Sequence, residues 1–134
     1  MKVLLDTNVL LDVAQARVPH RAESEAVVTW CVEHPGQSFV AWHTLSNLYF
    51  IIGNDRTARE FIADLLRVCE VPATGTAAAK LGLRLPLRDY EDALQLSAAL
   101  EAGADVIVTR DERDFRDSTI PGQSPSGFLA ALPR

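Results

Sequence analysis

The sequence predicts an α/β protein: a three-layer α/β/α domain with a central parallel sheet. Short apolar runs, such as Val3–Leu5 and Val106–Val108, alternate with stretches whose apolar residues recur at helical spacing. Such runs are typical of buried strands, and the periodic stretches are typical of helices. Because parallel strands need a crossover connection, this alternation favours a parallel sheet with helices on both faces.

The N-terminal part begins with a strand that leads directly into a helix. Its apolar run is short, and the following helix carries Val9, Leu10 and Val13 on one face. Pro35-Gly36 ends a second helix before a short strand. The expected elements are a strand at 2–5, helices at 7–16 and 22–33, and a strand at 38–41.

The remaining sequence contains the most regular helical pattern. Residues 44–52 place apolar side chains at i, i+3, i+4 and i+7, which predicts a helix with one face in the core. A long helix at 89–102 ends at Gly103. The other expected elements are helices at 56–67, 76–83 and 126–132, strands at 68–71 and 106–109, and a turn or short helix at 110–115.

Length and composition fit one globular domain over residues 1–134. The net charge of -5 argues against a generally basic nucleic-acid binder, but it does not exclude a local patch. Cys31 and Cys69 lack a metal-ligand spacing and are expected in the core. Because no apolar stretch has the length of a signal-peptide core or a membrane span, we expect a cytoplasmic protein without membrane contact.

Two carboxylates stand where predicted strands end. Asp6 follows Val3–Leu5 directly, and Asp111 comes soon after Val106–Val108. In open α/β sheets, ligands bind beyond the carboxyl ends of the strands, so both acids would face one crevice. Each also has a purely structural explanation: Asp6 as the cap of the next helix, and Asp111 as part of a polar turn.

A third acid, Asp92, would reach the same edge from the start of helix 89–102. It also fits a capping pair with Asp89, and Glu91 is explained as a solvated acid of the first helical turn. Three carboxylates within several Å repel one another unless a cation compensates or one of them takes up a proton. Mg²⁺ or Mn²⁺ suits an all-oxygen site and often binds substrate phosphates, which points to phosphate chemistry.

Four short motifs follow one another in an order and spacing that together are fairly specific. They are Leu5-Asp6-Thr7-Asn8, Thr44-Leu45-Ser46-Asn47-Leu48, Asp92-Ala93-Leu94 with Ala98-Ala99, and Val108-Thr109-Arg110-Asp111 with Asp114-Phe115. At these residues the chain resembles the PIN-domain nucleases, particularly the VapC-type toxins of bacterial and archaeal toxin–antitoxin modules. The resemblance spans nearly the whole chain.

The resemblance implies a PIN-like domain that binds Mg²⁺ or Mn²⁺ and hydrolyses phosphodiester bonds in RNA. The implied metal ligands are three carboxylates: Asp6, Asp92 and Asp111. Asp114 would be a further catalytic acid, either as a ligand or behind the ligands. The residues implied to orient the carboxylates or a metal-bound water are Thr7, Asn8 and Thr109. The implied partners are an RNA substrate, a cognate antitoxin and often a second copy of the chain.

Asn47 departs from the family pattern, which usually has Glu at this position. An amide oxygen can still coordinate a metal or hold its water, but it brings no charge and cannot act as a base, so metal affinity should fall. His43 shares its helical face and either looks into the site or bonds to a backbone group. Asp89 and Glu91 could supply charge, but neighbouring helix positions point about 100° apart, so both cannot face the ion with Asp92.

Three arginines recur beside the last acidic motif: Arg110, Arg113 and Arg116. An arginine fork matches phosphate oxygens, which favours RNA binding by this segment. An exposed turn in which these arginines pair with Glu112 and Asp117 explains the pattern equally well.

Two functions of different classes are consistent with these observations. The first is a metal-dependent endoribonuclease that acts as the toxin of a toxin–antitoxin pair. The second is a catalytically weakened PIN-like module that binds RNA or a protein, because Asn47 replaces the usual Glu. A phosphorylation-receiver domain ranks behind both, because the sequence lacks adjacent acids after the first strand and a Lys near the last.

Overall fold

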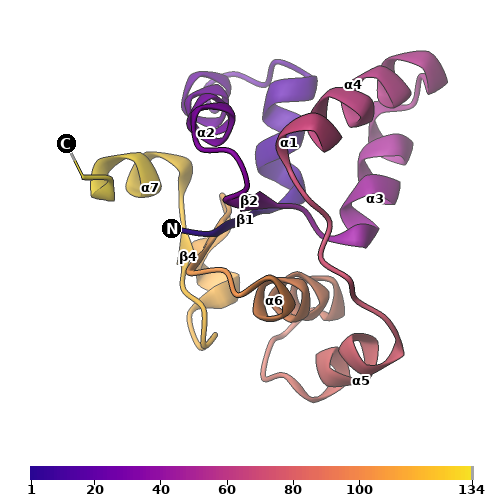
Figure 1. Cartoon of the computed structure of the whole chain (residues 1–134), viewed down its shortest axis with the longest axis vertical. Helices are drawn as coiled ribbons and strands as arrows, with labels where there is room; N and C mark the ends of the chain where they lie inside the picture. Colours follow the sequence, from indigo (N-terminus) through magenta and orange to yellow (C-terminus); the bar gives the residue numbers. More distant parts are fainter. Residues whose placement is uncertain (134) are drawn as a thin grey trace.

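The computed structural model describes residues 1–133, so Arg134, the last residue of the predicted domain, lies outside it. Within that range, four strands form one parallel sheet in the order β2-β1-β3-β4. The strands are β1 (Val3–Leu5), β2 (Ser38–Phe39), β3 (Val106–Val108) and β4 (Gly122–Gln123). Helices lie on both sides of the sheet (Figure 1), which confirms the predicted α/β/α architecture.

Each face of the sheet packs against its own set of helices. Successive strand residues point to opposite faces, so Val3 and Leu5 join one apolar cluster and Leu4 joins the other. The first cluster includes residues from α1 (Thr7–Ala14), α2 (Arg21–Glu33), α3 (Trp42–Ile52), α4 (Asp55–Val68) and α7 (Pro125–Ala131). The second includes α6 (Tyr90–Ala102), against which α5 (Thr76–Arg84) packs, and the 3₁₀ helix η1 (Glu112–Phe115). Cys31 and Cys69 are buried in the first cluster, as predicted.

The strand order brings the ends of β1 and β3 together. Leu5 pairs with Val108, and the backbone N–H of Asp6 donates to the carbonyl oxygen of Val108 over 2.9 Å. The chain runs from β1 to β2 on one side, whereas β3 pairs on the other side of β1. The ends of β1 and β3 therefore flank the switch in strand order, where open α/β sheets form their binding crevice.

Two predicted features differ from the structure. The predicted strand at 68–71 is wrong: α4 continues through Val68, and only Glu70 forms a bridge, to Phe39. The sequence pattern also missed β4, whose Gly122 and Gln123 pair with β3. Within residues 1–133, no helix has both the length and the apolar character needed to cross a membrane.

Candidate active site

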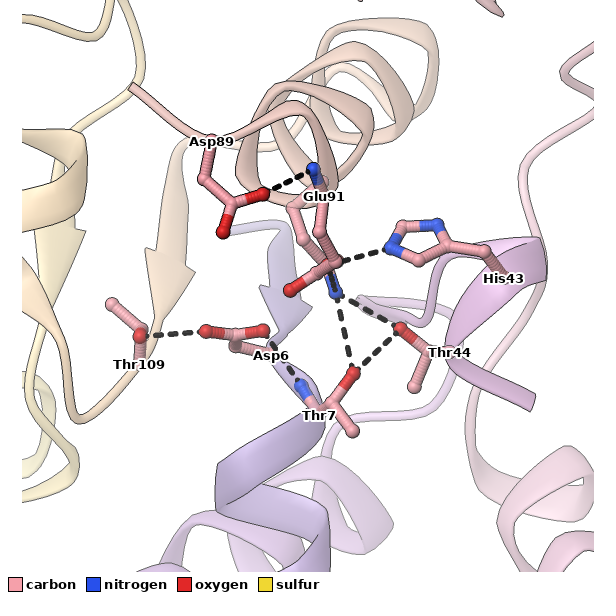
Figure 2. A network of polar contacts seen from close by, with 8 residues as sticks. Asp6, Thr7, His43, Thr44, Asp89, Glu91 and Thr109 are labelled. Carbon is pink, nitrogen blue, oxygen red and sulfur yellow. Dashed lines mark hydrogen bonds and ion pairs between the residues drawn. The ribbon is translucent and has the colours of Figure 1, made fainter. Parts of the chain in front are cut away.

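Asp6 is the buried carboxylate at the centre of the site. Its side chain is 4% exposed and lies between the end of β1 and the start of α1. Oδ1 accepts the backbone N–H of Thr7 over 2.8 Å, and Oδ2 accepts the Thr109 hydroxyl over 2.7 Å (Figure 2). The capping of α1 and the pairing of β1 with β3 therefore fix both oxygens in place.

Thr109 also connects Asp6 to Asp111. Its Oγ1 accepts the backbone N–H of Asp111 over 3.0 Å while donating to Asp6. Asn8 holds the same acid from α1, because its Nδ2 donates to Asp111 Oδ2 over 2.8 Å. The four residues thus form one hydrogen-bonded group at the ends of two adjacent strands, in which Thr109 and Asn8 each donate to an acid.

Asp92 and Asp114 lie beside this group. Both line one surface hollow, to which Arg88, Asp89 and Tyr90 also contribute. Asp92 stands in the first turn of α6, whereas Asp114 is an exposed residue of η1.

The negative charges of these acids act on one another. The pKa of Asp6 is raised to about 6: burial is the largest cause, the Glu91 and Asp111 carboxylates add to it, and the hydrogen bonds from Thr109 and Thr7 oppose it. Burial also raises the pKa of Asp92 to about 7, with further contributions from Glu91, Asp114, Asp6 and Asp89. A cation bound among these groups would relieve this repulsion.

The donor chemistry of the site fits a hard divalent cation. The acids offer oxygen ligands only, and Asn8 adds a buried amide oxygen that has no hydrogen-bond partner within residues 1–133. Over the same residues, no three Asp, Glu, His or Cys side chains stand close enough to hold an ion as they are placed. An ion held by three of these carboxylates would therefore require them to move closer together.

Replacing Asp92 by Asn is expected to stabilise the metal-free chain at pH 8. The folded-state pKa of about 7 lies above the ordinary value of 3.8, so the contribution of Asp92 to stability is fully present below about pH 4 and is lost as the pH rises through 7. Because Asp92 is partly solvated, the expected gain at pH 8 is only about 1 kcal/mol, or roughly 4 °C in Tm. Thermal melts in EDTA between pH 4 and 8 measure it.

Asp64→Asn, on the exposed surface of α4, is the matched control and should leave the pH profile unchanged. An Asp92→Asn profile that has the wild-type pH dependence contradicts the electrostatic account of the site.

Arg110 contacts a buried acid outside the carboxylate group. Its Nε lies 2.9 Å from Oδ2 of Asp12, which is fully buried in α1. The Arg110 guanidinium is thus held in an internal ion pair, and its side chain stays 26% exposed. Arg113 and Arg116 are exposed, and both line a second hollow that shares Arg88 and Asp114 with the first.

Glu91, explained from the sequence as a solvated acid that could also supply charge, has a side chain that is 39% exposed but is bonded to two other side chains. Glu91 Oε2 accepts His43 Nε2 over 2.7 Å and Gln95 Nε2 over 3.1 Å. Gln95, which is fully buried and was not singled out from sequence, also contacts Thr44 Oγ1 over 3.0 Å. The i, i+4 spacing of Glu91 and Gln95 on α6 was the available signal.

Asn47 lies one turn beyond His43 on α3 and is half-buried. His43, the first residue of the helical face that the two were predicted to share, points toward Glu91 (Figure 2). His43 is engaged by a side-chain carboxylate, so the alternative of a bond to a backbone group does not apply.

Comparisons with known proteins agree with this fold. No curated protein sequence matches the chain. A chain in the crystal structure of VapBC2 from Rickettsia felis, bound to a DNA fragment from their promoter, superposes with a TM-score of 0.70 at 14% identity, covering 92% of this chain and 98% of that one. A family model described as PIN domain matches residues 2–113. Since that match spans most of the sequence, the chain belongs to the PIN-domain family.

Proposed function

We propose that this protein is a divalent-metal-dependent endoribonuclease that hydrolyses RNA phosphodiester bonds. The observation that carries the proposal is the group formed by Asp6, Thr109 and Asp111 at the ends of two paired strands. The oxygens of these residues suit Mg²⁺ or Mn²⁺. Asp92 lies close enough for the charge of Asp6 to contribute to its raised pKa.

Each acid has a proposed part in the reaction. The proposed metal ligands are Asp6, Asp92 and Asp111, and Asp114 is the further catalytic acid that lines the Asp92 hollow. When bound, the ion lowers the pKa of a coordinated water and stabilises charge on the phosphate. Thr7, Asn8 and Thr109 keep the carboxylates oriented through the contacts described above.

The RNA backbone is proposed to lie over the exposed arginines next to the acids. Arg113 and Arg116 line a hollow that continues into the one lined by Asp92 and Asp114. Guanidinium groups there would bind the phosphates that flank the scissile bond, and they would offset the repulsion between RNA and the acidic site.

The likeness to a chain of a VapBC2 complex supports a role as the toxin of a toxin–antitoxin pair. The proposed partners are a cognate antitoxin that covers the acidic crevice and a second copy of the chain. The proposed location, in keeping with the proposed RNA substrate, is the cytoplasm.

A binding module is the second candidate function, and Asn47 is the observation that favours it. The amide stands on the face of α3 that carries His43, and it contributes no negative charge to the site. In this case the chain would bind RNA or a protein without turnover.

A cleavage assay separates the two functions. Full-length protein is incubated with labelled single-stranded and structured RNA in Mg²⁺, Mn²⁺ or EDTA. A nuclease is expected to cut in at least one metal and to lose all activity in EDTA, because the ion positions the water and the phosphate. RNA binding without cleavage in any divalent metal would support the binding module instead.

A further inference from the structure

We propose that Glu91 supplies the carboxylate that position 47 lacks, and that His43 and Gln95 hold it toward the metal site. The proposal rests on the metal-dependent function proposed above and assigns it a further residue. The proposed carboxylate stands on α6, whereas the Glu that is usual at position 47 would stand on α3.

The contacts of Glu91 leave one oxygen available for an ion. Oε2 accepts both His43 Nε2 and Gln95 Nε2. Because an ionised carboxylate only accepts hydrogen bonds, His43 donates through Nε2. Within residues 1–133 no hydrogen bond engages Oε1, which can therefore coordinate a metal or one of its waters.

The buried Gln95 connects Glu91 to Thr7, the first residue of the helix that Asp6 caps. Its Nε2 lies 3.1 Å from Glu91 Oε2 and 3.4 Å from the Oγ1 of Thr7, whose backbone N–H binds Asp6. Thr44, fully buried in α3, lies 3.0 Å from the same nitrogen. Figure 2 shows Glu91 extending from α6 into the space between Asp6 and His43.

The charge of Glu91 acts on both proposed ligands. After burial, Glu91 is the largest cause that raises the pKa of Asp92, and it is the largest charged contributor for Asp6. Asn47, by contrast, has no charge to exert such an effect.

The direct test is Mn²⁺ binding by the full-length protein, measured by isothermal titration calorimetry. Glu91→Gln keeps the side-chain length and is expected to weaken Mn²⁺ binding at least about tenfold. Asp89→Asn is the matched control: it removes one nearby charge, retains a helix-capping side chain, and should weaken binding less than threefold, on the order of a single screened surface charge.

A carboxylate introduced on α3 tests whether the loss of binding in Glu91→Gln comes from the missing charge or from a disturbed fold. The Glu91→Gln/Asn47→Glu variant is expected to regain most of the lost affinity. His43→Gln should weaken Mn²⁺ binding in the wild type but not in the Glu91→Gln background, because His43 acts through Glu91. Thermal melts confirm that each variant is folded.

Several outcomes overturn the proposal. If Glu91→Gln binds Mn²⁺ as tightly as Asp89→Asn does, while Asp6→Asn loses binding, the proposed role of Glu91 is rejected and the proposed metal site at Asp6 is retained. A wild type that binds no Mn²⁺ rejects both proposals. A wild type that binds Mn²⁺ through Glu91 but cuts no RNA supports this inference and rejects the nuclease.

Discussion

Replacing Asp6 by Asn is expected to slow metal-dependent RNA cleavage about a thousandfold while the chain stays folded. Asp6 is the most buried of the proposed ligands, and its charge is felt by Asp92. Asn removes that charge and leaves one oxygen to satisfy two donors, Thr7 and Thr109. Single-turnover rates on labelled RNA in Mn²⁺ measure the effect.

The stability of Asp6→Asn should remain close to that of the wild type at pH 8. One hydrogen bond is lost, at a cost of about 1 kcal/mol, but a buried carboxylate whose pKa is raised to about 6 is no longer forced to ionise. Circular dichroism melts in EDTA check this balance, so that lost activity is not mistaken for lost structure.

Asp105→Asn is the matched control for Asp6→Asn. Asp105 also accepts a backbone N–H, from Lys2 over 2.8 Å, but it lies at the opposite ends of β1 and β3. Its cleavage rate should equal that of the wild type. Equal rates for Asp6→Asn and Asp105→Asn would show that the measured cleavage comes from elsewhere, including a contaminating nuclease.

The position of Asp6 and Asp111 could be predicted because it depends on local features. An apolar run followed directly by an acid identifies a strand end without any knowledge of the rest of the fold. Strand pairing was not predictable in the same way, because β1 and β3 are separated by about a hundred residues and their register is set by packing on both faces. The hydrogen bond from Thr109 to Asp6 follows only from that register.

The short strand β4 illustrates a different limit. Gly122 and Gln123 follow Pro121 and have no alternating apolar pattern, so they resemble a turn. They pair because β3 offers an open edge, and Thr109 N–H donates to the Gln123 carbonyl over 2.8 Å. A Cβ at position 122 would lie 3.0 Å from the Cβ of Phe115, which explains glycine there. The edge strand thus depends on contacts that the local sequence does not encode.

The prediction of a strand at 68–71 was wrong although, in contrast to β4, an apolar pattern typical of a strand was present. Val68 completes α4, and only Glu70 is aligned with Phe39 for pairing. The roles of Glu91 and Arg110 were missed because each depends on a partner from another element, His43 and Asp12 respectively. An acid within an apolar helix, as Asp12 is, was the one sequence signal for a buried pair.

Arg110→Ala is expected to lower the free energy of unfolding by about 3 kcal/mol, or roughly 10 °C in Tm. The change leaves the fully buried Asp12 without its cation, and the Ser24 hydroxyl that donates to Asp12 Oδ2 over 3.0 Å cannot replace the charge. The 2.9 Å contact from Arg110 Nε does not meet hydrogen-bond geometry, so its contribution is mainly charge pairing. Urea denaturation of both proteins measures the loss.

Two further variants identify buried charge as the cause of this loss. Arg116→Ala removes an exposed arginine from the same segment and should change stability by less than about 0.5 kcal/mol. Arg110→Met combined with Asp12→Leu removes both charges and should recover most of the stability, because an apolar pair needs no desolvated ions. A double variant as unstable as Arg110→Ala would instead assign the loss to packing of the arginine side chain between α1 and the end of β3.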